Sequence, residues 1–362
     1  MSQLSCLTIS LSNIRKNYQS LQKLLGKGSK LSSVVKSNAY GLGANQVVRT
    51  LFEAGCREFY VDTCDEGIEI SRAFDDSVNV FVFKGIFAGE EELAEKHNLI
   101  PVLNNEAQIQ LWESYARKRN KKLACCLHID TGMTRLGIEY SSADKVITSM
   151  EQRGLLEVEY ILSHLACADD AKNKMNDEQL AKFKSFSDKH PTYKYSFANS
   201  AGIFLSKEMH FDQVRSGICL YGGIVGLASR DIIKPVVSLT TKIINIYNIK
   251  DSTTVGYSAT YRTKPEQRIA TISLGYFDGT LHQLGNKGFC CINGVNASYI
   301  GAVSMGLTSI DISSISEQNC GLGQEVEIIG KNISLETIAK LADTINYEVL
   351  TSLRNISYRK YV

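Results

Sequence analysis

The residue in this chain whose type and position most clearly suggest chemistry is a lysine directly after a strand-like run. Lys36 follows the apolar stretch 31–35 and precedes Ser37-Asn-Ala-Tyr-Gly-Leu-Gly43. A β-branched run bounded by Asn and Gly indicates a buried strand that ends in a loop. Apolar walls around the ammonium would favour the neutral amine, which condenses with an aldehyde to form a Schiff base. Taken alone, a surface lysine just past a strand end is the commoner outcome, because lysine is seldom fully buried.

Other polar residues follow strand-like segments in the same way. These segments cover residues 31–38, 57–63, 79–84, 99–104, 123–130, 156–164, 193–200 and 213–222, with helical spacing between them. The alternation predicts an α/β fold, a (β/α)8 TIM-type barrel rather than a doubly wound sheet. Active-site residues of such barrels lie at the C-terminal ends of the strands. Lys36, Asn38, Asp130, His164, Asn199, Ser200 and Arg215 fall there, although each alone could be a satisfied structural polar group.

The pattern changes near residue 226. Short alternating runs with Gly-rich turns cover residues 236–250, 253–261, 268–279, 288–301 and 325–330. Such runs are typical of an all-β domain. We therefore predict a barrel over residues 10–225 and a C-terminal β domain over residues 226–362, to which an N-terminal strand within residues 1–9 also belongs.

Composition excludes several classes of function. The formal charge of +2 over 362 residues gives no electrostatic footprint for nucleic acid or a membrane surface. No apolar run approaches the ~18 residues that span a bilayer, and the N-terminus lacks the pattern of a signal peptide, so we expect a cytoplasmic protein. The ten cysteines show no Cys-x-x-Cys spacing and the six histidines no His-x-x-x-His spacing, so no metal site is predicted.

Seven runs together carry a family resemblance. They are VVKSNAYGLG (34–43), HIDTGMTRLG (128–137), SHLACAD (163–169), NSAG (199–202), VRSGICLYG (214–222), VGYSATY (255–261) and ISLGYFDG (272–279). In this order the chain resembles the alanine racemases from Ser10 to Tyr361. That resemblance implies a pyridoxal-phosphate enzyme with a barrel and a β domain.

The resemblance also assigns cofactor contacts. Lys36 is similar to the lysine that carries the cofactor covalently, and Arg215 to the arginine that faces its pyridine nitrogen. An arginine can only donate there, so the ring nitrogen stays unprotonated. The other implied cofactor contacts are Tyr40, His164, Ser200, Gly217, Ile218 and Tyr347.

Racemisation needs proton transfer on both faces of Cα. The resemblance implies Lys36 for one face and Tyr257, from the partner subunit of a homodimer, for the other. A tyrosine must be tuned to act as a base near neutrality, and the implied partners are His164 and Arg215. From its residue type alone, His164 is more often a core histidine. Implied substrate contacts are Arg135, Met305 and Tyr276.

Two departures bear on the substrate. His128 stands where many members have a carbamylated lysine that supports Arg135, so a neutral imidazole or an anion would have to replace it. An equal alternative is that His128 only fills space at the end of its strand. Ala302 and Gly306 stand where the family usually has Arg and Asp, which removes two charges and opens volume.

We predict an enzyme that interconverts L- and D-alanine and supplies D-alanine for peptidoglycan. A racemase of serine, lysine or a broader set of amino acids is the alternative within this class, and a cofactor-binding paralogue without activity also stays open. A decarboxylase on a similar barrel would not need Tyr257, nor would a carrier of pyridoxal phosphate.

Overall fold

The first lobe of the molecule is built on eight parallel strands. The computed structural model describes residues 4–74 and 77–362. The barrel strands are β2 Lys30–Val34, β3 Glu58–Val61, β4 Asn79–Val82, β5 Leu99–Leu103, β6 Leu123–Asp130, β8 Leu156–Leu162, β9 Tyr195–Ser196 and β10 Gln213–Ser216. They are hydrogen-bonded in the order β5-β4-β3-β2-β10-β9-β8-β6, and the pairing of β5 with β6 closes the ring. The predicted (β/α)8 barrel is confirmed.

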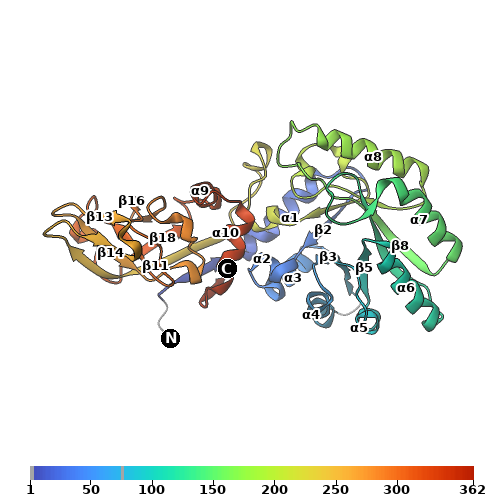
Figure 1. Cartoon of the computed structure of the whole chain (residues 1–362), viewed down its shortest axis with the longest axis horizontal. Helices are drawn as coiled ribbons and strands as arrows, with labels where there is room; N and C mark the ends of the chain where they lie inside the picture. Colours follow the sequence, from blue (N-terminus) through green and yellow to red (C-terminus); the bar gives the residue numbers. More distant parts are fainter. Residues whose placement is uncertain (1–3, 75–76) are drawn as a thin grey trace.

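Helices cover the outside of this barrel. They are α1 Leu11–Leu24, α3 Ala44–Glu53, α4 Cys64–Phe74, α5 Glu91–Lys96, α6 Glu106–Arg119, α7 Tyr140–Arg153 and α8 Met175–Lys189 (Figure 1). Polar caps begin two of them, because the side chains of Ser10 and Asn105 accept hydrogen bonds from backbone N–H groups three residues on. A two-residue strand, β7 Ile138–Glu139, lies beside the end of β6.

The last predicted barrel strand is shorter than expected. Residues 213–222 were predicted as one strand, but β10 ends at Ser216 and a 3-10 helix, η4 Ile218–Tyr221, follows it. Gly217 between them has φ −122° and ψ −88°, which does not continue the strand. This break puts backbone N–H groups at the C-terminal end of the barrel.

The second lobe is rich in strands. They are β1 Cys6–Ile9, β11 Val237–Asn248, β12 Thr254–Val255, β13 Tyr261–Arg262, β14 Arg268–Ile272, β15 Phe289–Ile292, β16 Val295–Ser298, β17 Thr308–Asp311, β18 Glu325–Ile329 and β19 Arg359–Tyr361. The long strand β11 is central, since β1, β14 and β18 all pair with it antiparallel. Two short helices, α9 Leu335–Leu341 and α10 Asn346–Ser352, complete the lobe.

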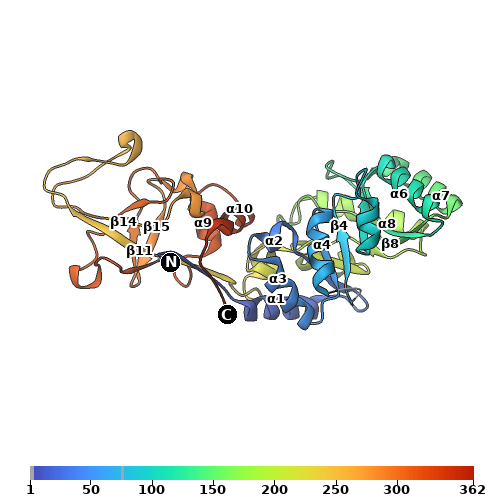
Figure 2. The same ribbon diagram turned by 90° about the horizontal axis from the view of Figure 1, so that it is seen from below.

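The two lobes lie end to end, and both termini help to join them (Figures 1 and 2). β1 pairs with β11 and β19 before the chain enters α1 of the barrel. At the other end of the chain, Arg359 donates to the Gly41 carbonyl and Tyr361 to the Leu42 carbonyl. The C-terminal strand is therefore fixed to the segment that follows Lys36. None of the helices in the described part of the chain combines the length and the apolar character needed to span a bilayer.

Candidate active site

Lys36 lies just beyond the C-terminal end of β2, at the rim of the barrel. Its Nζ is 3.3 Å from Oδ1 of Asp62 and 5.8 Å from the centre of the Phe83 ring. The side chain is 37% exposed. The expectation of apolar walls around this ammonium was therefore wrong, because Asp62 at the end of the neighbouring strand supplies an anionic partner. The amine is accessible from the open end of the barrel.

The backbone after Lys36 takes an unusual path. Ser37, Asn38, Ala39 and Tyr40 all have φ between +53° and +56°, which makes one left-handed turn. Such a turn costs about 1–2 kcal/mol for each residue that is not glycine. Glu66 helps to hold it, since one carboxylate oxygen accepts from Ser37 N–H at 2.7 Å and the other from Asp62 N–H at 2.8 Å. The Asn38 side chain accepts from Ala44 N–H and so begins α3. Asn38 is thus a structural residue.

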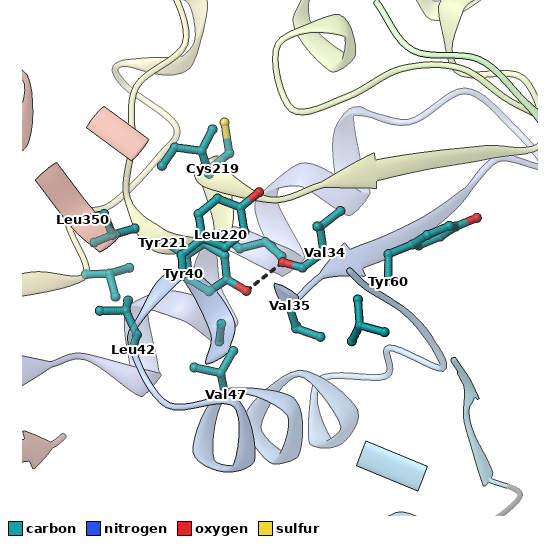
Figure 3. Close-up of a cluster of buried hydrophobic side chains, with 14 of the residues drawn as sticks. Val34, Val35, Tyr40, Leu42, Val47, Tyr60, Cys219, Leu220, Tyr221 and Leu350 are labelled. Carbon is teal, nitrogen blue, oxygen red and sulfur yellow. Dashed lines mark hydrogen bonds between the residues drawn. The ribbon is translucent and has the colours of Figure 1, made fainter. Parts of the chain in front are cut away.

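The turn places Tyr40 against the break after β10. Its ring is buried, 4.7 Å from that of Tyr221 and 6.0 Å from that of Tyr347, which α10 contributes from the second lobe. Figure 3 shows Tyr40 and Tyr221 side by side near Val34, whose carbonyl accepts a hydrogen bond from Tyr221. Burial raises the pKa of Tyr347 to about 12, so this phenol stays protonated and can donate to an anion.

Small groups complete the same corner. The Ser200 hydroxyl accepts a hydrogen bond from Gly217 N–H at 2.9 Å and lies 3.3 Å from the Ser216 hydroxyl. A Cβ on Gly217 would lie 2.9 Å from Cζ of Tyr40 and nearer still to its oxygen. Ile218, which is buried, begins η4 directly after Gly217. The structure thus brings Tyr40, Ser200, Gly217, Ile218 and Tyr347 together as a cradle of hydroxyl and N–H groups.

Arg215 projects from β10 into the barrel and is almost fully buried. Nη1 donates to the Ser196 hydroxyl at 2.6 Å, and Nη2 donates to the carbonyls of Ser163 and Phe197. No carboxylate in the described part of the chain pairs with this guanidinium. Its Nε is buried and has no hydrogen-bond partner among the described residues. A buried donor without a partner is costly, so it marks a place where a ligand acceptor fits.

Two imidazoles line the same end of the barrel. Nδ1 of His164 lies 3.5 Å from Nη2 of Arg215. Desolvation and the charge of Arg215 lower the pKa of His164 well below its usual range. Nδ1 of His128 lies 2.8 Å from Oδ1 of Asn104, and burial lowers the pKa of His128 to about 3. Both rings are therefore neutral near pH 7.

Arg135 lies on the loop after β6 and is exposed. Asp130 shapes this loop, because its carboxylate accepts hydrogen bonds from the N–H groups of Gly132, Met133 and Thr134. Asn199 is likewise structural, since its side chain bonds the Gly202 N–H and the Leu165 carbonyl. Among the polar residues that were predicted at this rim, three thus have side chains that are hydrogen-bonded to backbone groups: Asn38, Asp130 and Asn199.

Tyr257, Tyr276 and Met305 lie in the second lobe and are 74%, 46% and 61% exposed. Tyr276 N–H donates to the Ser304 carbonyl and Phe277 N–H to the Met305 carbonyl, which holds Tyr276 beside Met305. Tyr257 begins the 3-10 helix between β12 and β13, and β13 lies at the end of this lobe farthest from α2 Lys36–Tyr40 (Figure 1). One chain therefore does not bring Tyr257 to Lys36.

Sequence reasoning missed several residues of the site. Asp62 and Asn104 directly follow strands β3 and β5, so the rule that singled out Lys36 could have found both. Arg215 donates to the carbonyl of Ser163, directly after β8, and to the hydroxyl of Ser196, in β9. No local sequence pattern indicates these contacts, because they depend on the direction in which the Arg215 side chain points from β10.

Fold and site together define a barrel with an accessible lysine at its rim, a buried guanidinium from β10 and a strand-rich second lobe. Two family models match the chain, the alanine racemase N-terminal domain over residues 9–225 and the alanine racemase C-terminal domain over residues 236–361. The chain belongs to the alanine racemase family.

The chain is also similar to individual members of this family. The alanine racemase of Rickettsia canadensis is 40% identical over 358 residues, which cover 99% of each chain. The structure also matches that of alanine racemase from Bartonella henselae with covalently bound pyridoxal phosphate, at 34% identity, a TM-score of 0.94 and full coverage of both chains. The biosynthetic alanine racemase of Pseudomonas aeruginosa matches with 29% identity, a TM-score of 0.91 and full coverage of both chains.

Proposed function

We propose that this chain is a pyridoxal-phosphate-dependent racemase that interconverts L- and D-alanine as a homodimer. The observation that carries the proposal is the buried Nε of Arg215, which has no protein partner in the described residues and belongs to β10, the strand that pairs with β2 before Lys36. A pyridine nitrogen is an acceptor that suits this donor. We further propose that the enzyme works in the cytoplasm and that its D-alanine serves peptidoglycan synthesis.

The residues at the rim fit this cofactor. Tyr40, Ser200, Tyr347 and the N–H groups at Gly217 and Ile218 would hold the phosphate, and Lys36 would hold the aldehyde carbon. Small residues in the cradle leave room for phosphate oxygens close to the backbone. When bound, the cofactor supplies an electron-poor ring that makes the Cα–H of an attached amino acid acidic.

The protein's own residues would then move the proton. Lys36 exchanges it at Cα on one face, and Tyr257 of the partner subunit exchanges it on the other. His164 would assist Tyr257. Because a guanidinium can only donate, Nδ1 of His164 accepts from Arg215, and the neutral ring carries its proton on Nε2. That N–H can stabilise a phenolate oxygen, which is the form of tyrosine that removes a proton.

A shared site explains why Tyr257 is exposed. Its side chain is 74% exposed in one chain, and it lies in the 3-10 helix before β13, the strand at the end of the second lobe farthest from α2 (Figure 1). A two-fold dimer that packs the second lobe of each chain against the barrel of the other would complete two sites. Tyr276 and Met305 would reach the substrate in the same way.

Complementation between inactive variants tests this arrangement. Lys36→Ala and Tyr257→Phe should each lose racemisation, assayed as inversion and loss of the α-proton of L-alanine in D₂O. When equal amounts are unfolded together and refolded with cofactor, half of the dimers are mixed. Each mixed dimer holds one intact site, so about a quarter of wild-type activity should return.

Other outcomes would contradict specific parts of the proposal. Full activity of Tyr257→Phe in both directions would exclude the two-base assignment. Absence of recovery in a mixture that contains mixed dimers would place both residues of a site in one chain. Release of CO₂ from an amino acid by the wild-type enzyme, without inversion, would identify a decarboxylase.

A further inference from the structure

His128 is a buried group at the rim that racemisation as proposed does not use. It lies in β6, two residues before the end of this strand, which leads into the loop that carries Arg135, and is 9% exposed. Its Nδ1 has a partner in Asn104 at 2.8 Å, whereas no described residue bonds its Nε2. A buried ring with one free nitrogen at this end of the barrel points to a positioning role.

Asn104 determines which nitrogen of His128 carries the proton. The Asn104 amide nitrogen donates to the carbonyls of Phe83 at 2.9 Å and Val102 at 2.8 Å, so both of its N–H groups are used. The oxygen of the amide must therefore face His128. An oxygen accepts, so Nδ1 of His128 is the donor. In a neutral ring the free Nε2 then presents a lone pair.

A second layer fixes this orientation. Gln108 accepts the backbone N–H of Asn104 at 2.9 Å with its side-chain oxygen. The nitrogen of the same amide donates to the Lys84 carbonyl at 2.7 Å. Rotation of the Asn104 amide would break both of its carbonyl contacts and place two donors against each other. The tautomer of His128 is thus set by the fold.

The loop that carries Arg135 folds back onto this ring. A Cβ on Gly137 would lie 3.2 Å from Cδ2 of His128, so the loop backbone passes close to the edge of the imidazole that carries Nε2. The charge of Arg135 contributes to the lowered pKa of both His128 and His164. The guanidinium of Arg135 has no hydrogen-bond partner in the described residues.

Arg135 is exposed in this structure and makes no hydrogen bond to His128. We propose that its guanidinium turns inward and donates to Nε2 of His128, and that this bond holds the arginine in position for the substrate carboxylate. The part that concerns the substrate rests on the proposed function, whereas the hydrogen bond itself does not. A lone pair attracts a cationic donor and repels an anion. The site therefore needs no bound anion to orient Arg135.

Nitrogen NMR of ¹⁵N-histidine-labelled protein tests the hydrogen bond directly. His128→Gln assigns the His128 signals by their loss. The spectrum should show a protonated Nδ1 and a bare Nε2, and Arg135→Ala should shift the Nε2 signal alone. A protonated Nε2, or an Nε2 signal that Arg135→Ala leaves unchanged, would overturn the proposal. This readout needs neither cofactor nor turnover.

Kinetics of the cofactor-loaded enzyme test the consequence. His128→Leu removes the acceptor and should raise KM for alanine about 10- to 100-fold, with a smaller change in kcat, as expected for the loss of a charge-assisted hydrogen bond. His128→Gln keeps an acceptor and should recover most of this loss. Asn104→Leu should raise KM although His128 is intact, because the proton of His128 is then no longer held on Nδ1.

Three further outcomes distinguish the hydrogen bond, the positioning role and the proposed function from one another. If chloride or bicarbonate lowers KM of the wild-type enzyme, an anion orients Arg135 and the proposal is wrong. If the NMR result holds but no amino acid is racemised, the hydrogen bond stands and the proposed function fails. If racemisation holds but His128→Leu and His128→Gln behave alike, the positioning role is excluded.

Discussion

One carboxylate oxygen of Glu66 accepts a hydrogen bond from the backbone N–H of Ser37, 2.7 Å away. The contact joins α4 to the first residue of the left-handed turn that follows Lys36. The second oxygen of Glu66 holds the backbone of Asp62, whose side chain reaches Nζ of Lys36. One acidic side chain therefore fixes both the lysine's backbone and its ionic partner. The strain of the turn is offset by such contacts, which keep Lys36 aimed at the barrel opening.

Glu66→Ala should disturb this geometry. Two charge-assisted hydrogen bonds to backbone N–H groups are lost, so the free energy of unfolding should fall by about 2–3 kcal/mol. Racemisation should fall as well, since Lys36 is no longer held in one position. Urea unfolding and kcat measure the two effects. Glu69→Ala is the matched control, because Glu69 is exposed on the same helix and should change stability by no more than about 0.5 kcal/mol.

Gly217→Ala should weaken cofactor binding. Its Cβ would collide with the phenol of Tyr40, and the neighbouring Tyr221 ring leaves Tyr40 little room to move. Overpacking of this kind costs about 1–3 kcal/mol, so the dissociation constant of pyridoxal phosphate should rise about 10- to 100-fold. Titration of the cofactor-free protein by absorbance measures it. Gly321→Ala, where an added Cβ meets nothing within 4 Å, should bind normally. If Gly217→Ala bound pyridoxal phosphate with unchanged affinity, Tyr40 would not be a contact of the phosphate.

The barrel was predictable from sequence because burial on both faces leaves a strong local pattern. Residues 123–130 were predicted as a strand and form β6 over the same residues. β17 and β19 were missed. β19 has three residues and pairs in parallel with β1 from the other end of the chain, so no local pattern indicates it. The left-handed turn was also missed, since Ser37 to Tyr40 contain no glycine that would signal positive φ.

The residues of the site were easier to predict than their surroundings. Lys36 and Arg215 were identified by position and resemblance, and the structure places both at the same end of the barrel. The ion pair of Lys36 with Asp62 and the unpartnered Nε of Arg215 were not predictable. Both depend on neighbouring strands of a closed sheet, where register and side-chain direction decide which groups meet. Sequence order alone does not contain that information.

Acid should destabilise the barrel through its buried imidazoles. The pKa of His128 is lowered from an ordinary 6.5 to about 3, so the unfolded chain binds a proton that the folded chain does not. The contribution of His128 to the free energy of unfolding is fully present above the ordinary pKa and is lost as the pH drops from 6.5 toward 3. At pH 5 the loss from His128 should be about 2 kcal/mol relative to pH 7. The pKa of His164 is shifted in the same direction and adds to this loss.

The fluorescence of Trp112 can follow this unfolding, because the single tryptophan is buried in α6 of the barrel. In His128→Gln, the stability difference between pH 7 and pH 5 should shrink by about 2 kcal/mol. His282→Gln, at an exposed histidine of the second lobe, should leave the difference as it is in the wild type. An equal acid loss in the wild type and His128→Gln would mean that His128 is not neutral in the folded protein.

The absence of a side chain at Gly306 should broaden the choice of substrate. Its added Cβ would meet only Asp278, at 3.9 Å, so space is open beside Met305. One additional hydroxyl changes discrimination by no more than about 100-fold in such a pocket. We therefore expect kcat/KM for serine to lie within about 100-fold of that for alanine. A larger gap in the wild-type enzyme would show that other residues close this space.

Gly306→Asp should narrow that choice and carry a cost in stability. The new carboxylate fills the space beside Met305, so the ratio of kcat/KM for alanine over serine should rise about 10-fold. It also comes near Asp278, whose pKa burial already raises, and the repulsion should lower the melting temperature. Ala302→Arg in the same chain should restore the melting temperature by supplying a cation, while the substrate ratio stays high. Equal ratios in the wild type and Gly306→Asp would show that Gly306 does not face the substrate.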